Sequence, residues 1–200
     1  MNQAFPLLLP ALLIHFAISN DLSAEFLVEL CDTTKLDPTL LQGAREETSA
    51  LFAAAEARLR WEGNCNQPPT TTSSSARIYV VPRIPEGIAN RYRQYRDKTN
   101  VMGYVLADEG KKRASVIYVA REAVEAVASR SGRTSLTEAH RARAMGRVFA
   151  HELAHRFLRS GHTKKGILKD SLDSGDLIDE DRTTLFFSPE QMRILRGAPQ

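Results

Sequence analysis

The stretch that decides the fold of this chain covers residues 135–161 and reads SLTEAHRARAMGRVFAHELAHRFLRSG. Its apolar residues recur every three or four positions, which predicts one long amphipathic helix that packs on a sheet. This apolar stripe consists of Ala142, Met145, Phe149, Leu153 and Phe157. Ser135, with Glu138 three residues later, predicts a capping box at the start of the helix. Gly161, which can adopt positive φ, predicts its end.

The same helix carries an H-E-x-x-H motif, formed by His151, Glu152 and His155. Residues i and i+4 lie on nearly the same side of a helix, here roughly opposite to the apolar stripe. Two imidazoles at this spacing can hold one metal ion, while the intervening glutamate reaches a metal-bound water. Three of the five histidines fall between positions 151 and 162. The sequence therefore predicts a metal site; the alternative is a solvated helix with accidental histidines.

His162 is the preferred third ligand, because it directly follows the predicted helix end and imidazole suits zinc. A sharp reversal at Gly161 would turn its ring toward the other two and leave a fourth zinc position open to water. An acidic run further along the chain offers an alternative third ligand. This run contains Asp170, Asp173, Asp176, Asp179, Glu180 and Asp181.

With Zn²⁺ as cofactor, the expected reaction is peptide-bond hydrolysis. Zinc would lower the pKa of its bound water and polarise a substrate carbonyl, and Glu152 would be the catalytic general base. Two other functions stay open. One is a binding or regulatory protein that keeps the fold and zinc without turnover, and the other is an interaction domain without metal.

The remaining segments predict an α/β fold with a mixed, mostly parallel sheet, an antiparallel edge hairpin and a small C-terminal subdomain. Strand patterns occur at residues 26–31, 58–62, 76–81, 101–107 and 114–120, with a hairpin turn signal at 108–111. Helices are expected at residues 37–56 and 121–129. A last helix begins with Ser188 as cap and Pro189 at its first position.

Composition limits the function classes. With 42% apolar and 26% charged residues, the chain is ordinary for one globular domain, expected at residues 20–200. The net charge of +3 comes from scattered Lys and Arg without long basic runs, which argues against a nucleic-acid partner.

The N-terminus and the cysteines indicate a location. Residues 5–18 form an apolar run of signal-peptide length, which predicts a signal peptide at residues 1–19, export to the periplasm or the extracellular space, and no stable membrane span. The alternative is a buried N-terminal segment. Cys31 and Cys65 each follow a predicted strand, so they could pair in an oxidising compartment or remain two separate buried thiols.

Through His151, Glu152, His155, His162 and the segment at residues 166–168 (Gly-Ile-Leu), the chain resembles the metzincin clan of zinc peptidases, and small exported bacterial proteins with this motif in particular. The resemblance spans about residues 25–196 in element order. It implies that the three histidines bind zinc and that Glu152 is the base. It also implies that the hairpin strand nearest the cleft binds a peptide or protein substrate as an added antiparallel strand.

Two features differ from the metzincin pattern. His162 is the seventh residue after His155 instead of the sixth, and Leu158 stands at the position of the clan's glycine. The exit from the helix is therefore expected to differ. Leu168 stands where the clan has the methionine of a turn beneath the metal.

Overall fold

The structure is a computed structural model that describes residues 24–63, 65–70, 72–88, 101–106, 115–132 and 135–197. The predicted signal peptide and the predicted hairpin turn at residues 108–111 lie outside the described residues.

Five strands form one mixed sheet in the order β2-β1-β3-β5-β4. Their bounds are β1 (Glu25–Asp32), β2 (Arg58–Glu62), β3 (Ser75–Val81), β4 (Gly103–Leu106) and β5 (Ser115–Ala120). Strand β4 runs antiparallel to β5, and the other neighbours are parallel. This confirms the predicted α/β fold and its mostly parallel sheet, and each strand lies within two residues of its predicted range.

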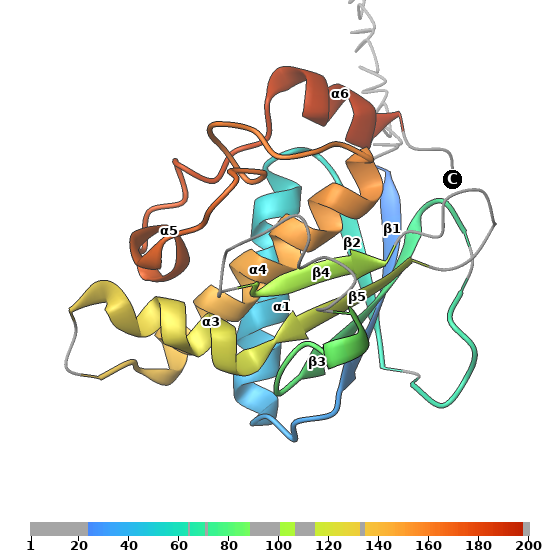
Figure 1. Cartoon of the computed structure of the whole chain (residues 1–200). Coiled ribbons are helices and arrows are strands. Elements are labelled where there is room, and N and C mark those ends of the chain that lie inside the picture. The colour runs from blue at the N-terminus through green and yellow to red at the C-terminus, as the bar shows by residue number, and fades with distance from the viewer. Residues whose placement is uncertain are drawn as a thin grey trace, which may run out of the picture.

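The helices are α1 (Pro38–Ala53), α3 (Arg121–Ala128), α4 (Glu138–Leu158), α5 (Ser174–Ile178) and α6 (Pro189–Arg196), with a short 3₁₀ helix, η1 (Ser129–Ser131), after α3. Helices α1 and α4 pack side by side on one face of the sheet, with α1 near β2 and α4 near β4 and β5 (Figure 1). Helix α6 lies at the C-terminal end of α4 (Figure 1).

Alternating residues of the strands build the core between the sheet and the helices. Phe26 and Val28 of β1, Ile78 of β3 and Ile117 of β5 are at most 1% exposed, in one cluster with Phe149 of α4. The period of two along a strand sends these side chains to the helix face. Apolar residues of the C-terminal segment belong to the same cluster, including Ile167, Leu177 and Leu195. The predicted C-terminal subdomain therefore shares the main core.

Helices α1 and α4 approach closely where α4 has a glycine. A Cβ on Gly146 would lie 2.5 Å from the carbonyl oxygen of Ala44, so no larger residue fits without a shift. Next to this contact, Thr48 Oγ1 of α1 donates to the carbonyl oxygen of Gly146 at 2.9 Å. Helix α4 is consequently buried almost all round, and its predicted apolar stripe is only one part of its packed surface.

The ends of the helices agree only in part with the predicted caps. The predicted box of Ser135 and Glu138 is wrong: Thr137 is the N-cap, and its partner is His140, whose backbone N–H donates to Thr137 and whose ring accepts from the Thr137 N–H. The predicted cap of α6, Ser188, is confirmed, and Asp37 caps α1. Helix α1 ends at Ala53, three residues before the predicted Glu56.

The predicted end of α4 at Gly161 is also wrong. The helix ends at Leu158, and Arg159 itself takes the left-handed conformation, with φ of 50°. A non-glycine residue pays a modest strain for this backbone, on the order of 1 kcal/mol. The Arg159 N–H still finds the His155 carbonyl oxygen at 3.0 Å, so the reversal begins two residues earlier than the glycine signal indicates.

On the face of the sheet that points away from α1 and α4, a disulfide joins Cys31 of β1 to Cys65 in the loop after β2. Of the two readings of these cysteines, the structure shows the pair. Glu29 and Arg77 form a buried ion pair on the same face, with 2.8 Å between Glu29 Oε2 and Arg77 Nε. Within the described part of the chain, the helices lack the length and apolar character that crossing a membrane requires.

Candidate metal centre

The last two turns of α4 carry the H-E-x-x-H motif. His151 and Glu152 are buried, with 8% and 7% exposure, and His155 is half-buried. One turn of helix separates the two histidines, and their rings meet with Nε2 atoms 3.1 Å apart. The helix spacing therefore does bring both imidazoles to one point, as predicted.

His162 joins this pair from the segment that follows α4. Its ring centroid lies 5.4 Å from that of His151 and 4.6 Å from that of His155. The three side chains offer ligand atoms that all lie within 4.8 Å of one another, an arrangement that could hold a metal ion. The reversal at Arg159 thus achieves what was expected of Gly161.

Two backbone carbonyls fix the rings of the helical histidines. His151 Nδ1 lies 2.7 Å from the carbonyl oxygen of Ile167, and His155 Nδ1 lies 2.8 Å from that of Ser160. A carbonyl oxygen only accepts, so each Nδ1 must carry the hydrogen, and in a neutral ring Nε2 then carries the lone pair.

These tautomers test whether the donor set suits a metal. With these tautomers the two Nε2 atoms face each other 3.1 Å apart, close enough for one cation to lie near both. The imidazole of His162 converges on the same place, so the three rings could hold a metal ion. Three imidazoles are a known ligand set of catalytic zinc sites, and the residues present therefore fit a metal ion of this kind.

The turn after His162 contacts the histidine cluster through its backbone. Gly166 has φ of 81°, and a Cβ there would lie 2.5 Å from the carbonyl oxygen of Phe186, so both its conformation and its surroundings require glycine. Ile167 follows, and its carbonyl oxygen is the acceptor for His151. Ile167 and Leu168 are fully buried. The segment quoted for the resemblance thus contacts the centre through its backbone.

Glu152 reaches from α4 to the edge strand of the sheet. A Cβ on Gly103 of β4 would lie 2.3 to 2.6 Å from three side-chain atoms of Glu152. The absence of a side chain at Gly103 therefore leaves the space that the Glu152 carboxylate occupies. The predicted base therefore lies against β4.

The acidic run lies near the centre but has other contacts. Asp170 Oδ1 is 3.4 Å from Nδ1 of His162. Asp173 caps α5, and both Asp173 and Asp176 contact Lys169, whose pKa these contacts raise. The backbone hydrogen bond from Asp176, the largest influence, lowers the pKa of Asp173.

Sequence reasoning named the histidines and Glu152 but missed three supporting features. Gly103 gave no signal, because a glycine near a strand end is ordinary. The carbonyl oxygens of Ser160 and Ile167 are backbone atoms that any residue supplies. Asp170 did carry a signal, since it belongs to the acidic run that was considered for the third ligand, although its contact with His162 was not foreseen.

Compared with models of known protein families and with curated proteins, the chain gives no match.

Proposed function

We propose that this protein is a zinc-dependent peptidase of metzincin-like type, with His151, His155 and His162 as the metal ligands. One observation carries the proposal: the three rings offer ligand nitrogens within 4.8 Å of one another, with the Nε2 atoms of His151 and His155 3.1 Å apart and their Nδ1 atoms at backbone carbonyls. Imidazole ligands suit zinc, although another divalent ion could replace it in vitro.

In the proposed reaction the three histidines hold zinc and Glu152 is the general base. Zinc, when bound by three histidines, lowers the pKa of a coordinated water and polarises a carbonyl group. Glu152 accepts the proton of the attacking water, and its carboxylate lies against Gly103 of the edge strand β4. Its burial limits its contact with bulk water.

The substrate is a peptide or protein segment in extended conformation. Strand β4 is the edge of the described sheet and runs antiparallel to β5. An edge strand offers backbone donors and acceptors to one more strand, which is how many peptidases and binding domains hold a peptide. Gly103 is part of this strand, so a peptide paired with β4 passes close to Glu152.

Metal analysis is the first test. Protein purified without chelators should contain close to one zinc per chain, and His151→Ala and His155→Ala variants should lose it. A wild-type protein that takes up no zinc under these conditions would remove the basis of the proposal and favour an interaction domain without metal.

Turnover is the second test, and it uses Glu152→Gln. This variant keeps the shape of the side chain and the three ligands but lacks the base. With a broad peptide library, we expect it to retain zinc and to lose activity by about 10²-fold or more. If the wild type and the variant bind zinc equally and neither cleaves a peptide, the protein is a metal-containing binding or regulatory protein.

We further propose that the chain is exported. The disulfide between Cys31 and Cys65 supports this, because such bonds persist in oxidising compartments. Mass spectrometry of the protein recovered from its own cells tests it: a mature N-terminus at Asn20 is expected, and an intact Met1 in a cytosolic fraction would exclude it.

A further inference from the structure

A single turn after His162 contains Ile167, whose carbonyl oxygen contacts Nδ1 of His151. The Thr163 N–H donates to the carbonyl oxygen of Leu168 at 2.8 Å, and the Asp170 N–H donates to that of Thr163 at 3.1 Å. Thr163 and Lys169 form a bridge of β type. These contacts close residues 163–170 into a loop whose ends lie side by side. His162 directly precedes the loop and Asp170 is its last residue, so the two side chains lie next to each other.

His162 differs from the other two histidines in what fixes its ring. His151 and His155 stand on a buried helix, and backbone carbonyls hold their Nδ1 atoms. His162 lies beyond the helix, and its side chain is 35% exposed. An oxygen of the Asp170 side chain lies 3.4 Å from its Nδ1.

We propose that Asp170 is the positioning residue for His162, and that it acts through that ring and is not itself a metal ligand. This inference rests on the proposed zinc site. The Asp170 carboxylate only accepts hydrogen bonds, so it holds the hydrogen on Nδ1 and directs Nε2 toward the other two rings. Its negative charge also makes the imidazole a stronger donor to a cation.

The shape of the loop at residues 163–170 holds Asp170 beside His162. This shape requires Gly166, because only glycine tolerates its positive φ and the nearby carbonyl oxygen of Phe186. The same loop presents the Ile167 carbonyl oxygen to His151. Residues 163–170 thus orient two of the three ligands. The first and third histidines share one support, whereas His155 has its own in Ser160.

Zinc affinity of Asp170→Asn tests the inference, measured by competition with a chromophoric chelator. Loss of such a carboxylate partner typically lowers metal affinity by about 10- to 100-fold. Asp179→Asn is the matched control, because it removes the same charge from the same acidic run at an exposed position. We expect about tenfold weaker binding for Asp170→Asn, a change below about twofold for Asp179→Asn, and partial recovery in Asp170→Glu.

A double-mutant cycle shows whether Asp170 acts through His162. In a His162→Ala background, adding Asp170→Asn should change zinc affinity by less than about twofold, because the ring that it orients is gone. The d–d spectrum of the Co²⁺ form provides a second measurement. Asp170→Asn should alter that spectrum, since the orientation of one ligand changes, whereas Asp179→Asn should leave it as in the wild type.

The outcomes separate this inference from the function on which it rests. A wild type without zinc uptake overturns both. Zinc uptake by the wild type with equal affinity in Asp170→Asn overturns only the positioning role. An equal loss of affinity on adding Asp170→Asn to the wild type and to His162→Ala also overturns it, because Asp170 would then act without His162.

Discussion

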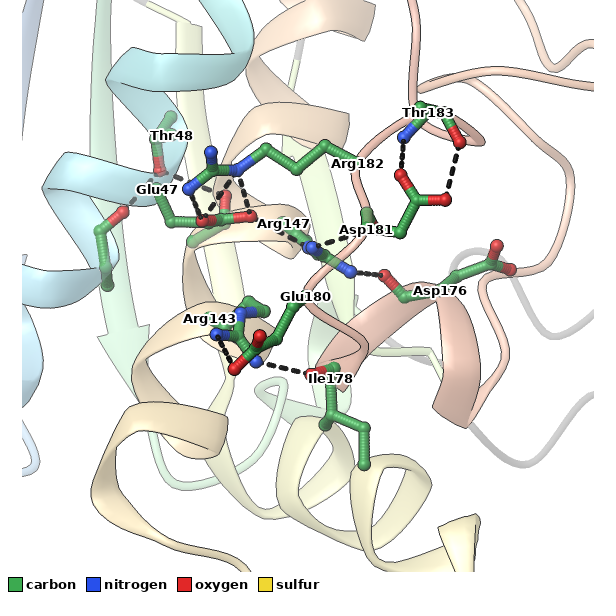
Figure 2. Close-up of polar contacts among 12 residues, drawn as sticks. Glu47, Thr48, Arg143, Arg147, Asp176, Ile178, Glu180, Asp181, Arg182 and Thr183 are labelled. Atoms are coloured by element: carbon green, nitrogen blue, oxygen red, sulfur yellow. Dashed lines mark hydrogen bonds and ion pairs between the residues drawn. The ribbon is translucent and has the colours of Figure 1, made fainter.

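Helix α4 presents two polar centres on one side, and they differ in how their charges and lone pairs are satisfied. Arg147, His151 and His155 follow one another at intervals of four residues. Arg147 is fully buried, and its Nε donates to Glu47 Oε1 of α1 at 2.9 Å. Its Nη atoms donate to the carbonyl oxygens of Asp176 and Asp181, as Figure 2 shows.

Each nitrogen of the Arg147 guanidinium has a hydrogen-bond acceptor within the protein. Arg182 adds a second cation on Glu47, with 2.6 Å between Arg182 Nη2 and Glu47 Oε2 (Figure 2). Burial lowers the pKa of Arg147, and Glu47 opposes this change. The guanidinium stays charged because its ordinary pKa is far above neutral. These contacts connect residues 176–182, which follow α4 in the chain, to α1 and α4.

Around His151 and His155 the protein instead gathers ring nitrogens: their Nε2 atoms lie 3.1 Å apart, and the ring of His162 converges on them, an arrangement that could hold a metal ion. Structural clusters such as that of Arg147 pair each charge with an opposite charge or a carbonyl oxygen, whereas a metal site brings several potential ligands of one kind together. Polarity on a buried helix face therefore does not identify a site by itself, but the kind of groups that converge there does.

The largest expected effect on stability comes from Arg147→Met, which breaks the network. Removing one partner of a buried ion pair typically costs about 3–5 kcal/mol, because the other charge stays buried. We expect a loss of about 3 kcal/mol or more in the free energy of unfolding, measured by denaturant titration of the metal-free protein.

Two further variants sharpen this result. His155→Ala should change metal-free stability by about 1 kcal/mol or less, since it removes a half-buried side chain and one hydrogen bond but leaves no buried charge without its partner. Glu47→Leu with Arg147→Met should be more stable than Arg147→Met alone, because no carboxylate remains buried opposite the missing guanidinium. A His155→Ala variant as unstable as Arg147→Met would mean that the two centres do not differ in the proposed way.

Gly103→Ala tests the metal centre with a smaller change. The new methyl group would overlap the Glu152 side chain, which is flexible and can move away at little cost in stability. Displacement of a catalytic group by about 1 Å can lower turnover up to 10²-fold, so a loss of about tenfold or more is expected, with zinc content unchanged. Gly63→Ala is the control, since open space surrounds that position. Equal activity in both variants would show that Glu152 needs no such space.

The smallest of these expected effects is a fall in the free energy of unfolding at acid pH, when Glu47 of the Arg147 network becomes protonated. Burial raises the pKa of Glu47, but hydrogen bonds and charges from Arg182 and Arg147 outweigh it, and the pKa lies below its ordinary value. Such a carboxyl contributes stability above its unfolded-state pKa, and the contribution is lost as pH falls through the folded-state value.

The measurement compares wild-type and Glu47→Gln unfolding free energies in metal-free protein between pH 7 and pH 3. The difference in favour of the wild type should be full at neutral pH and shrink below about pH 4.5, the ordinary pKa of glutamic acid. A difference that stays constant to pH 3 would contradict the lowered pKa.

Helix capping shows where reading the sequence was insufficient. Ser135 and Glu138 have the spacing of a capping box, yet Thr137 and His140 form the box that the structure contains. The pair of Thr137 and His140 has no Glu or Gln at the third helical position, so the capping-box pattern did not single it out. The same holds at the other end, where Arg159 accepts a strained backbone two residues before a glycine.

The strands, the long helix and the pairing of His151 with His155 could be predicted from the sequence, because strand alternation and the helix period are local properties of the chain. The place of His162, the space for Glu152 beside Gly103 and the contact of Asp170 with the third histidine depend on tertiary packing. These contacts join segments that no local periodicity relates, such as residues 103 and 152. They arise when the sheet edge and the loop at residues 163–170 pack around the end of α4.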